Sequence, residues 1–150
     1  MSVVAGSDIF TNTWNTFYKI ISGNVVDTGS RGGSAWIFAD YPMIQEGKED
    51  KHPGFPIITI DSFENSGNLY TFNKIQNTLS SMVTIHSRNK RHLDVISSDV
   101  HDAIVSNRKV LGSSGLHNLQ FTPGGTETYA EDRYNKTHMK MMGIQVDTVL

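Results

Sequence analysis

The first hydrophobic pattern in the chain predicts an α-helix over residues 7–22. Its large apolar residues recur every three or four positions, at Phe10, Trp14, Phe17 and Ile21. This spacing places them on one face of a helix, and Gly23 is expected to end the helix in the left-handed conformation. A stripe of three aromatic residues is most often part of a core, and the alternative is a groove for a peptide or a cofactor.

A second helix is expected from about residue 89 to residue 111, with the same periodicity. Its apolar face consists of Leu93, Ile96, Val100, Ala103, Ile104 and Leu111. Arg108 and Lys109 complement the negative end of the helix dipole, and Gly112 is expected to close the helix.

Alternation of apolar and polar residues predicts the main strands. Over residues 79–87, Leu79, Val83 and Ile85 face one side, which is the period of a strand with one buried face. Residues 55–61 predict another strand, and Pro56 suits its start or a sheet edge.

Three further strands follow from shorter patterns. They are expected at residues 36–38, around residues 116–121, and from about residue 136 to the end. In the last of these the apolar residues occupy both phases, so a bulge near Met141 or burial on two sides is expected.

Loops rather than helices join most of these strands. The pattern therefore predicts a single α+β domain over residues 1–150, with an antiparallel or mixed β-sheet and two main α-helices packed on one face. Long loops are expected near residues 27–35, 43–54, 62–77 and 122–133, the third with a turn at Gly67 and Asn68 and the fourth as a long hairpin loop.

Composition and charge narrow the class of protein. Thirteen basic and fifteen acidic residues give a net charge of -2, which disfavours non-specific binding of nucleic acid. Cysteine is absent, which excludes disulfides and thiolate chemistry. No apolar run approaches the ~20 residues of a membrane helix, and the start lacks the features of a secretion signal, so a soluble domain folded in the cytoplasm is expected.

The polar residues are mostly uncharged. Ser, Thr, Asn and Gly together make up 52 of the 150 residues, while 19% of the residues are charged, below the ~25% of an average soluble domain. Such a surface is easily desolvated against a partner and suits a β-rich assembly protein at least as well as a monomeric enzyme.

The motifs of catalysis and cofactor binding are weak. The glycines of residues 29–34 run into an expected strand rather than a helix, so they predict a loop and not a phosphate site. The six histidines (His52, His86, His92, His101, His117 and His138) lack metal-ligand spacing. Residues 112–115 follow a helix and indicate a helix end, not a nucleophile elbow. No catalytic, cofactor-binding or metal-binding residue is assigned, and a small hydrolase using His86 or His101 with a neighbouring acid is the enzyme alternative.

A basic cluster stands at the start of the second expected helix. Arg88, Lys90, Arg91 and His92 lie within five residues and oppose the helix dipole there. The cluster is either a solvated turn or a contact with an acidic surface of a partner.

Three stretches of the chain carry a resemblance to a known family. They are residues 27–42 leading to 52–60, residues 82–86 followed by 88–111, and residues 133–138 running into 142–149. In these stretches the chain resembles the small tail-terminator and tail-completion (head–tail joining) proteins of long-tailed viruses of bacteria and archaea.

The resemblance implies a non-enzymatic structural protein of the virion. Its copies would form a ring, usually a hexamer, that caps the tail tube, ends tube polymerisation and joins the tail to the head or neck. The implied partners are the chain itself, the tail tube protein and a head–tail connector or neck protein. DNA would pass through the lumen without specific binding, no cofactor or membrane would be involved, and the protein would lie in the tail or neck after assembly in the host cytoplasm.

Eleven residues are the expected contacts with a neighbouring subunit or partner. They are Arg31, Trp36, Asp40, Tyr41, Lys48, Lys51, Arg88, Lys90, Arg91, Glu131 and Arg133. One alternative is another neck (head-completion) protein of the same virion. The other is a monomeric α+β module that binds a peptide or ligand through its aromatic helix, which exposure of Phe10, Trp14 and Phe17 would favour and burial of all three would exclude.

Overall fold

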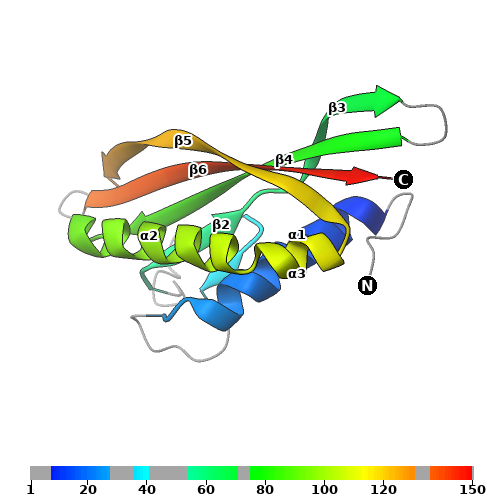
Figure 1. Cartoon of the computed structure of the whole chain (residues 1–150). Coiled ribbons are helices and arrows are strands. Elements are labelled where there is room, and N and C mark those ends of the chain that lie inside the picture. Colours follow the sequence, from blue (N-terminus) through cyan, green and yellow to red (C-terminus); the bar gives the residue numbers. More distant parts are fainter. Residues whose placement is uncertain (1–7, 28–35, 41–53, 71–74, 131–135, 150) are drawn as a thin grey trace.

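A mixed six-stranded β-sheet lies over a layer of helices (Figure 1). The computed structural model describes residues 8–27, 36–40, 54–70, 75–130 and 136–149. The helices are α1 (Asp8–Asn24), α2 (Lys90–Ser106) and α3 (Arg108–Ser113). The strands are β1 (Ile37–Phe38), β2 (Ile57–Ile60), β3 (Glu64–Tyr70), β4 (Ile75–Ser87), β5 (Leu116–Ala130) and β6 (Lys136–Val149). The predicted α+β class is confirmed.

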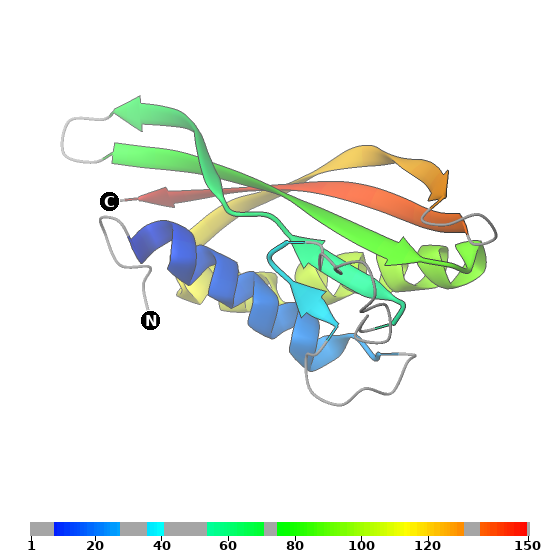
Figure 2. The ribbon, with the colours of Figure 1, turned by 180° about the vertical axis from the view of Figure 1, so that it is seen from behind.

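The long strand β4 organises the sheet. The strand order is β1-β2-β4-β6-β5, and β3 also pairs with β4. β2 pairs with the second half of β4 and β3 with the first half, while β6 pairs along almost its whole length. Only β1 and β2 run parallel among the described pairs. The β3–β4 hairpin projects past the helical layer in both views (Figures 1 and 2).

The core lies between the sheet and the helices. Leu79, Val83 and Ile85 of β4 are buried on the face that the alternation predicts, and the predicted face of α2 is buried against them. Phe17 and Ile21 of α1 complete this layer. Burial of each large side chain of this kind contributes roughly 1.5–3 kcal/mol, so this shared core stabilises the packing of the helices on the sheet.

The second predicted helix is broken into two. Asn107 lies between α2 and α3 with φ -102° and ψ 18°, and its side-chain amide donates to the Ala103 carbonyl at 2.7 Å. Asparagine disfavours helix interiors because its side chain bonds to nearby backbone groups in this way. The closure predicted at Gly112 is also wrong, because Gly112 lies inside α3 and it is Gly115 that takes the left-handed conformation, with φ 88°.

The end of the first helix differs in a similar way. α1 continues through Gly23 to Asn24, whose side-chain amide donates to the Ile20 carbonyl at 2.7 Å. The left-handed end predicted at Gly23 is therefore wrong, because an asparagine satisfies a free carbonyl of the last turn instead.

Two of the predicted loops are strands. Residues 64–70 form β3, which pairs with the start of β4, and the predicted turn at Gly67 and Asn68 lies inside β3 next to a register shift after Asn65. Residues 122–130 form the second half of β5, paired with β6. Both stretches are polar and lack alternation, so their pairing depends on a neighbouring strand that only the folded chain provides.

The bulge predicted near Met141 is on the opposite strand. The β5–β6 register shifts between Pro123 and Thr126, whereas β6 pairs regularly with β4. A Cβ atom on Gly124 would lie 2.5 Å from the Met141 carbonyl oxygen, so the bulge needs glycine for a close backbone approach. The predicted loops at 27–35 and 43–54 fall mostly on residues outside the described ranges.

Candidate functional site

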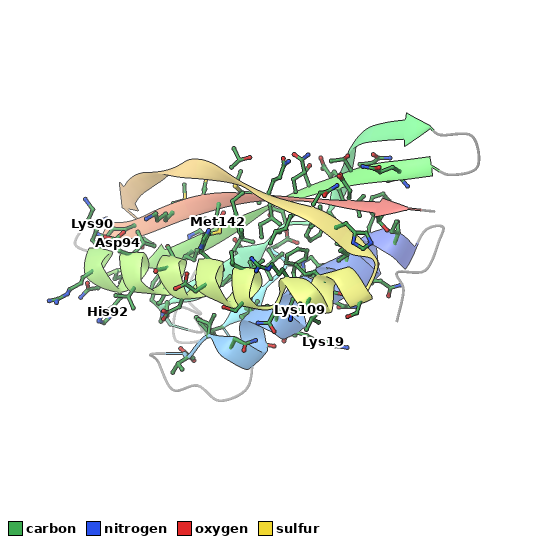
Figure 3. All side chains as sticks on the ribbon, viewed as in Figure 1. Lys19, Lys90, His92, Asp94, Lys109 and Met142 are labelled. Carbon is green, nitrogen blue, oxygen red and sulfur yellow. The ribbon has the colours of Figure 1, made fainter. Side chains whose placement is uncertain are left out.

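The N-terminal end of α2 gathers exposed basic side chains. Asn89 caps the helix, because its side-chain oxygen accepts from the backbone N–H groups of Arg91 at 2.9 Å and His92 at 3.2 Å. We call Arg88, Lys90, Arg91 and His92, all exposed, the basic end. Figure 3 shows Lys90 and His92 on this part of α2. Within this fully described helix no acidic residue lies in the first turn, so the positive end of the dipole adds to the charge.

A cation–π contact of Arg88 and an ion pair of Asp94 lie at or next to the basic end. The guanidinium carbon of Arg88 lies 5.0 Å from the ring centroid of Phe55, within the range of a cation–π contact. Lys140 of β6 lies 3.5 Å from an Asp94 carboxylate oxygen on α2. Both partners of that ion pair are exposed, so it contributes little stability and serves mainly to orient α2 on the sheet.

Three carboxylates gather where β1 and β2 end. Because Phe38 pairs with Thr59 in parallel, Asp40 and Asp61 both follow the carboxyl ends of neighbouring strands, and Glu64 begins β3. We call Asp40, Asp61 and Glu64 the acidic cluster. Burial raises the pKa of the Asp61 carboxyl, and the like charges of Asp40 and Glu64 raise it further. The cluster is thus electrostatically unfavourable within one subunit, and a cation from outside would relieve it.

The basic end and the acidic cluster lie at opposite ends of β2. Phe55, which contacts Arg88, precedes the strand, and Asp61 follows it. The four residues of β2 alone span about 10 Å, and both surfaces lie beyond its ends. This separation exceeds the ~8–10 Å Debye length at moderate salt, so the two surfaces do not neutralise each other within one subunit.

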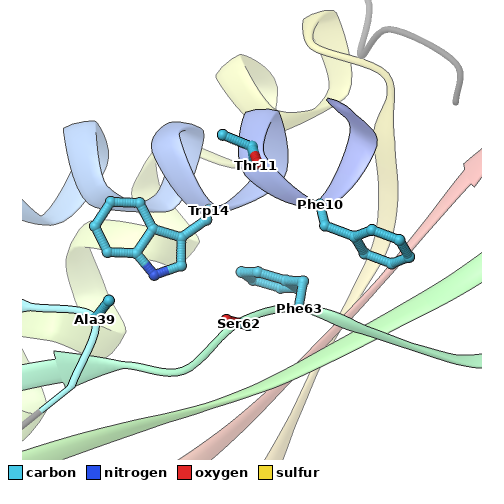
Figure 4. A pocket seen from close by; sticks show the side chains of 6 residues that line it. All are labelled: Phe10, Thr11, Trp14, Ala39, Ser62 and Phe63. Atoms are coloured by element: carbon cyan, nitrogen blue, oxygen red, sulfur yellow. The ribbon is translucent and has the colours of Figure 1, made fainter. Parts of the chain in front are cut away.

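An apolar pocket adjoins the acidic cluster (Figure 4). It has a volume of about 210 Å³ and is lined by Phe10, Thr11, Trp14, Ala39, Ser62 and Phe63. A drug-sized ligand needs roughly 300–1,000 Å³, so this pocket matches one or two side chains. Phe10, at 37% exposure, stands at its rim.

Hydrogen bonding and stacking fix the pocket walls. The indole Nε1–H of Trp14 donates to the Ile60 carbonyl at 2.7 Å, which ties α1 to the end of β2. Phe63 stacks on Phe17 with ring centroids 5.1 Å apart. The pocket is therefore preformed by these contacts, and does not depend on a ligand for its walls.

The pocket and the acidic cluster form one surface. Ala39 precedes Asp40, Ser62 follows Asp61, and Phe63 precedes Glu64. We call the combined surface the acidic-rimmed pocket. An apolar hollow with charges at its edge is the usual anatomy of a protein–protein contact.

The sheet face opposite the helices is polar. Strand register places Thr78, Ser80 and Met82 of β4 beside Asp147, Gln145 and Gly143 of β6 on this face. Thr78 donates to the Asp147 carboxylate at 2.8 Å, and Gln76 at 3.0 Å. Among the described positions of this face in β4 and β6 there is no lysine or arginine. These positions therefore provide no continuous basic surface that would bind the phosphates of a nucleic acid.

The histidines of the enzyme alternative lie on different elements, β4 and α2. His101, on α2, has its Nδ1 3.6 Å from an Asp102 carboxylate oxygen, and both side chains are well exposed to water. The centroid of the His101 ring lies 4.4 Å from the centroid of the Phe121 ring. His86 is buried in β4. Among the described residues no group of three or more histidine, cysteine, aspartate or glutamate side chains is placed to hold a metal ion, and no described helix is long and apolar enough to cross a membrane.

Five of the eleven predicted contact residues are described. Arg88, Lys90 and Arg91 lie together at the basic end, and Asp40 lies in the acidic cluster. Trp36 is 1% exposed, so its prediction as a contact is wrong, because its side chain packs in the core. The remaining six (Arg31, Tyr41, Lys48, Lys51, Glu131 and Arg133) lie outside the described residues.

Sequence reasoning missed the acidic-rimmed pocket. Its residues come from α1, from the end of β1 and from the stretch between β2 and β3, which the sequence pattern left irregular. The position of Phe10, the first residue of the aromatic stripe, could have indicated a pocket here. Side chains in the first turn of a helix are often only partly covered by the rest of the fold. Of the predicted aromatic stripe, Phe17 and Ile21 are fully buried, Trp14 is half-buried and Phe10 is exposed.

No protein-family model matches the chain, and no curated protein matches it. The functional argument therefore depends on the chain's own surfaces.

Proposed function

We propose that this chain is a structural assembly protein whose copies join head to tail into a closed ring. The observation that carries the proposal is the separation of the basic end from the acidic cluster at the two ends of β2. A cyclic ring uses heterologous contacts, in which each subunit offers two different and complementary surfaces. Opposite charges on such surfaces fix the orientation of the contact and suppress wrong pairings.

The ring we propose caps the tail tube of a long-tailed virus, ends tube polymerisation and joins the tail to the head or neck. The resemblance to tail-terminator and tail-completion proteins is the basis for this step. The described parts of the three stretches that carry this resemblance include β1 and β2, the second half of β4 with α2, and most of β6. The partners in this proposal are the tail tube protein and a head–tail connector or neck protein.

The polar sheet face is compatible with a lumen that DNA crosses. Its described positions in β4 and β6 include Ser, Thr, Gln and Asp side chains together with Met82, Met139 and Met141, and no lysine or arginine. Phosphate neutralisation by basic side chains is the main source of non-specific affinity for DNA, so a wall of this composition lets DNA slide. In this proposal the protein is non-enzymatic, uses no cofactor, and belongs to the tail or neck of the virion after assembly in the host cytoplasm.

Two alternatives keep the same surfaces but change their use. Another neck protein of the same virion would need the same head-to-tail contacts in a different ring. A monomeric module that binds a peptide is favoured by one observation, the exposed Phe10 and half-buried Trp14 at the apolar pocket. Burial of Phe17 limits that groove to the first turns of α1.

The test of the ring is the solution mass of the purified protein, followed by electron microscopy. Light scattering over a range of concentrations is expected to give about six times the 16.7 kDa of one chain, and negatively stained images of the same fractions should show rings with an open centre. A monomer at every concentration would contradict the proposal, because two complementary surfaces on one chain should associate without a partner. The peptide-binding module would then be the function to test.

A further inference from the structure

We infer that the acidic-rimmed pocket receives Val95 and Arg91 of α2 from a second copy of the chain. This inference depends on the proposed function, because it names the contact by which the copies join. It assigns the apolar pocket to Val95 and the acidic cluster to the basic end that surrounds Arg91.

The side chains of α2 match the pocket in polarity, and long side chains at the rim can bridge the difference in spacing. Val95 is an exposed apolar residue, with 52% of its surface accessible, and Arg91 precedes it by four residues. Residues four apart lie on the same helix face, about 6 Å apart along the axis. In the pocket, apolar Ala39 and Phe63 are each followed directly by a residue with a carboxylate. The Cα atoms of an apolar residue and its acidic neighbour are therefore about 3.3–3.8 Å apart.

Charge favours the same pairing. The basic end carries three cationic side chains and the positive end of the α2 dipole, and in the acidic cluster the like charges of Asp40 and Glu64 add to burial in raising the pKa of Asp61. A valine buried at the centre with ion pairs at the rim has the arrangement of an interface hot spot, in which the rim excludes water from the anchor.

The positions of the two surfaces are compatible with a contact between copies. The start of α1, which carries Phe10, and the start of α2 lie at opposite ends of the molecule in both views (Figures 1 and 2). One chain therefore cannot fill its own pocket with its own α2. A neighbour can fill it, and leaves its own pocket open for the next copy.

A second exposed valine provides the competing occupant. Val110 of α3 is 48% exposed and follows Arg108 and Lys109. Residues one or two apart on a helix do not face each other, so Val110 cannot bring a cation to the rim in the way that Val95 does with Arg91.

Engineered cysteines test the contact, since the chain has none of its own. Ala39 and Val95 are both exposed, so the single variants Ala39→Cys and Val95→Cys should fold normally. The two variants are mixed, oxidised mildly and analysed without reductant. A disulfide forms only where two Cα atoms come within about 7 Å, so a covalent dimer reports the proposed contact. Mixing Ala39→Cys with Val110→Cys is the matched control.

We expect the Ala39→Cys and Val95→Cys mixture to crosslink at least tenfold faster than the control mixture. Equal or faster crosslinking with Val110→Cys would overturn the inference and assign the pocket to α3. The solution mass of the unoxidised mixture separates two failures. Rings without the Ala39–Val95 crosslink overturn this inference alone, whereas a monomer overturns it together with the proposed ring.

Discussion

The hydrogen bond from Trp14 to the end of β2 is the contact on which the pocket depends most. Trp14→Phe keeps an aromatic ring but removes the Nε1–H that donates to the Ile60 carbonyl at 2.7 Å. Leaving that carbonyl without its donor costs about 1–3 kcal/mol. The expected loss in the free energy of unfolding is therefore about 2 kcal/mol, of which the smaller ring contributes a part.

Urea denaturation followed by circular dichroism measures this loss. With a slope of about 2 kcal/mol per molar urea, the unfolding midpoint of Trp14→Phe should fall by about 1 M. Phe10→Leu is the control, because Phe10 lines the same pocket but is exposed, and its midpoint should move by no more than about 0.25 M, or ~0.5 kcal/mol. An unchanged midpoint in Trp14→Phe would refute the claim that this bond holds the pocket wall.

Two further changes test the sheet and the acidic cluster. Gly124→Ala should destabilise the protein by about 1–3 kcal/mol, because its Cβ atom would lie 2.5 Å from the Met141 carbonyl oxygen. The control Gly112→Ala, with nothing within 4 Å of the new atom, should stabilise the protein by about 0.5–1 kcal/mol. Equal denaturation midpoints for the two variants would contradict the packing argument. Burial and the like charges of Asp40 and Glu64 raise the pKa of Asp61 above its ordinary 3.8 in the folded chain. The ionised Asp61 carboxylate therefore lowers the free energy of unfolding at neutral pH. This loss of stability disappears as the pH falls through the folded pKa to below 3.8. Asp61→Asn should therefore raise the free energy of unfolding at pH 7 and give no gain near pH 3, measured on dilute monomer; a gain independent of pH would mean that the charge of Asp61 is not its cause.

The elements that sequence predicted well are those set by local periodicity. The strand at Leu79, Val83 and Ile85 and the buried face of α2 repeat at the period of their own element, so no distant residue is needed to recognise them. The long polar strands are different. β3 and the second half of β5 form because they pair with β4 and β6, and nothing in their own composition marks them as strands.

The candidate site divides in the same way. The basic end is contiguous in sequence, so it was visible before the fold was known. The acidic cluster requires the parallel pairing of β1 with β2, and the pocket requires three separate segments to meet. Trp36 shows the converse error, since a short apolar run next to a polar loop gives no sign of whether its tryptophan faces solvent or the core.

The head-to-tail contact is the central claim of the account, and two charge-reversed variants test it most directly. Lys90→Glu with Arg91→Glu disables the basic end, and Asp40→Lys with Glu64→Lys disables the acidic cluster; all four positions are exposed, so each variant should fold. The account predicts that each variant alone is a monomer by sedimentation velocity, since each keeps only one working surface. Their equimolar mixture should form rings again, with about six times the 16.7 kDa of one chain, because the unaltered surfaces pair at one contact and the two charge-reversed surfaces are complementary at the next. Rings formed by either variant alone, or a mixture that stays monomeric while the unaltered protein associates, would contradict the account.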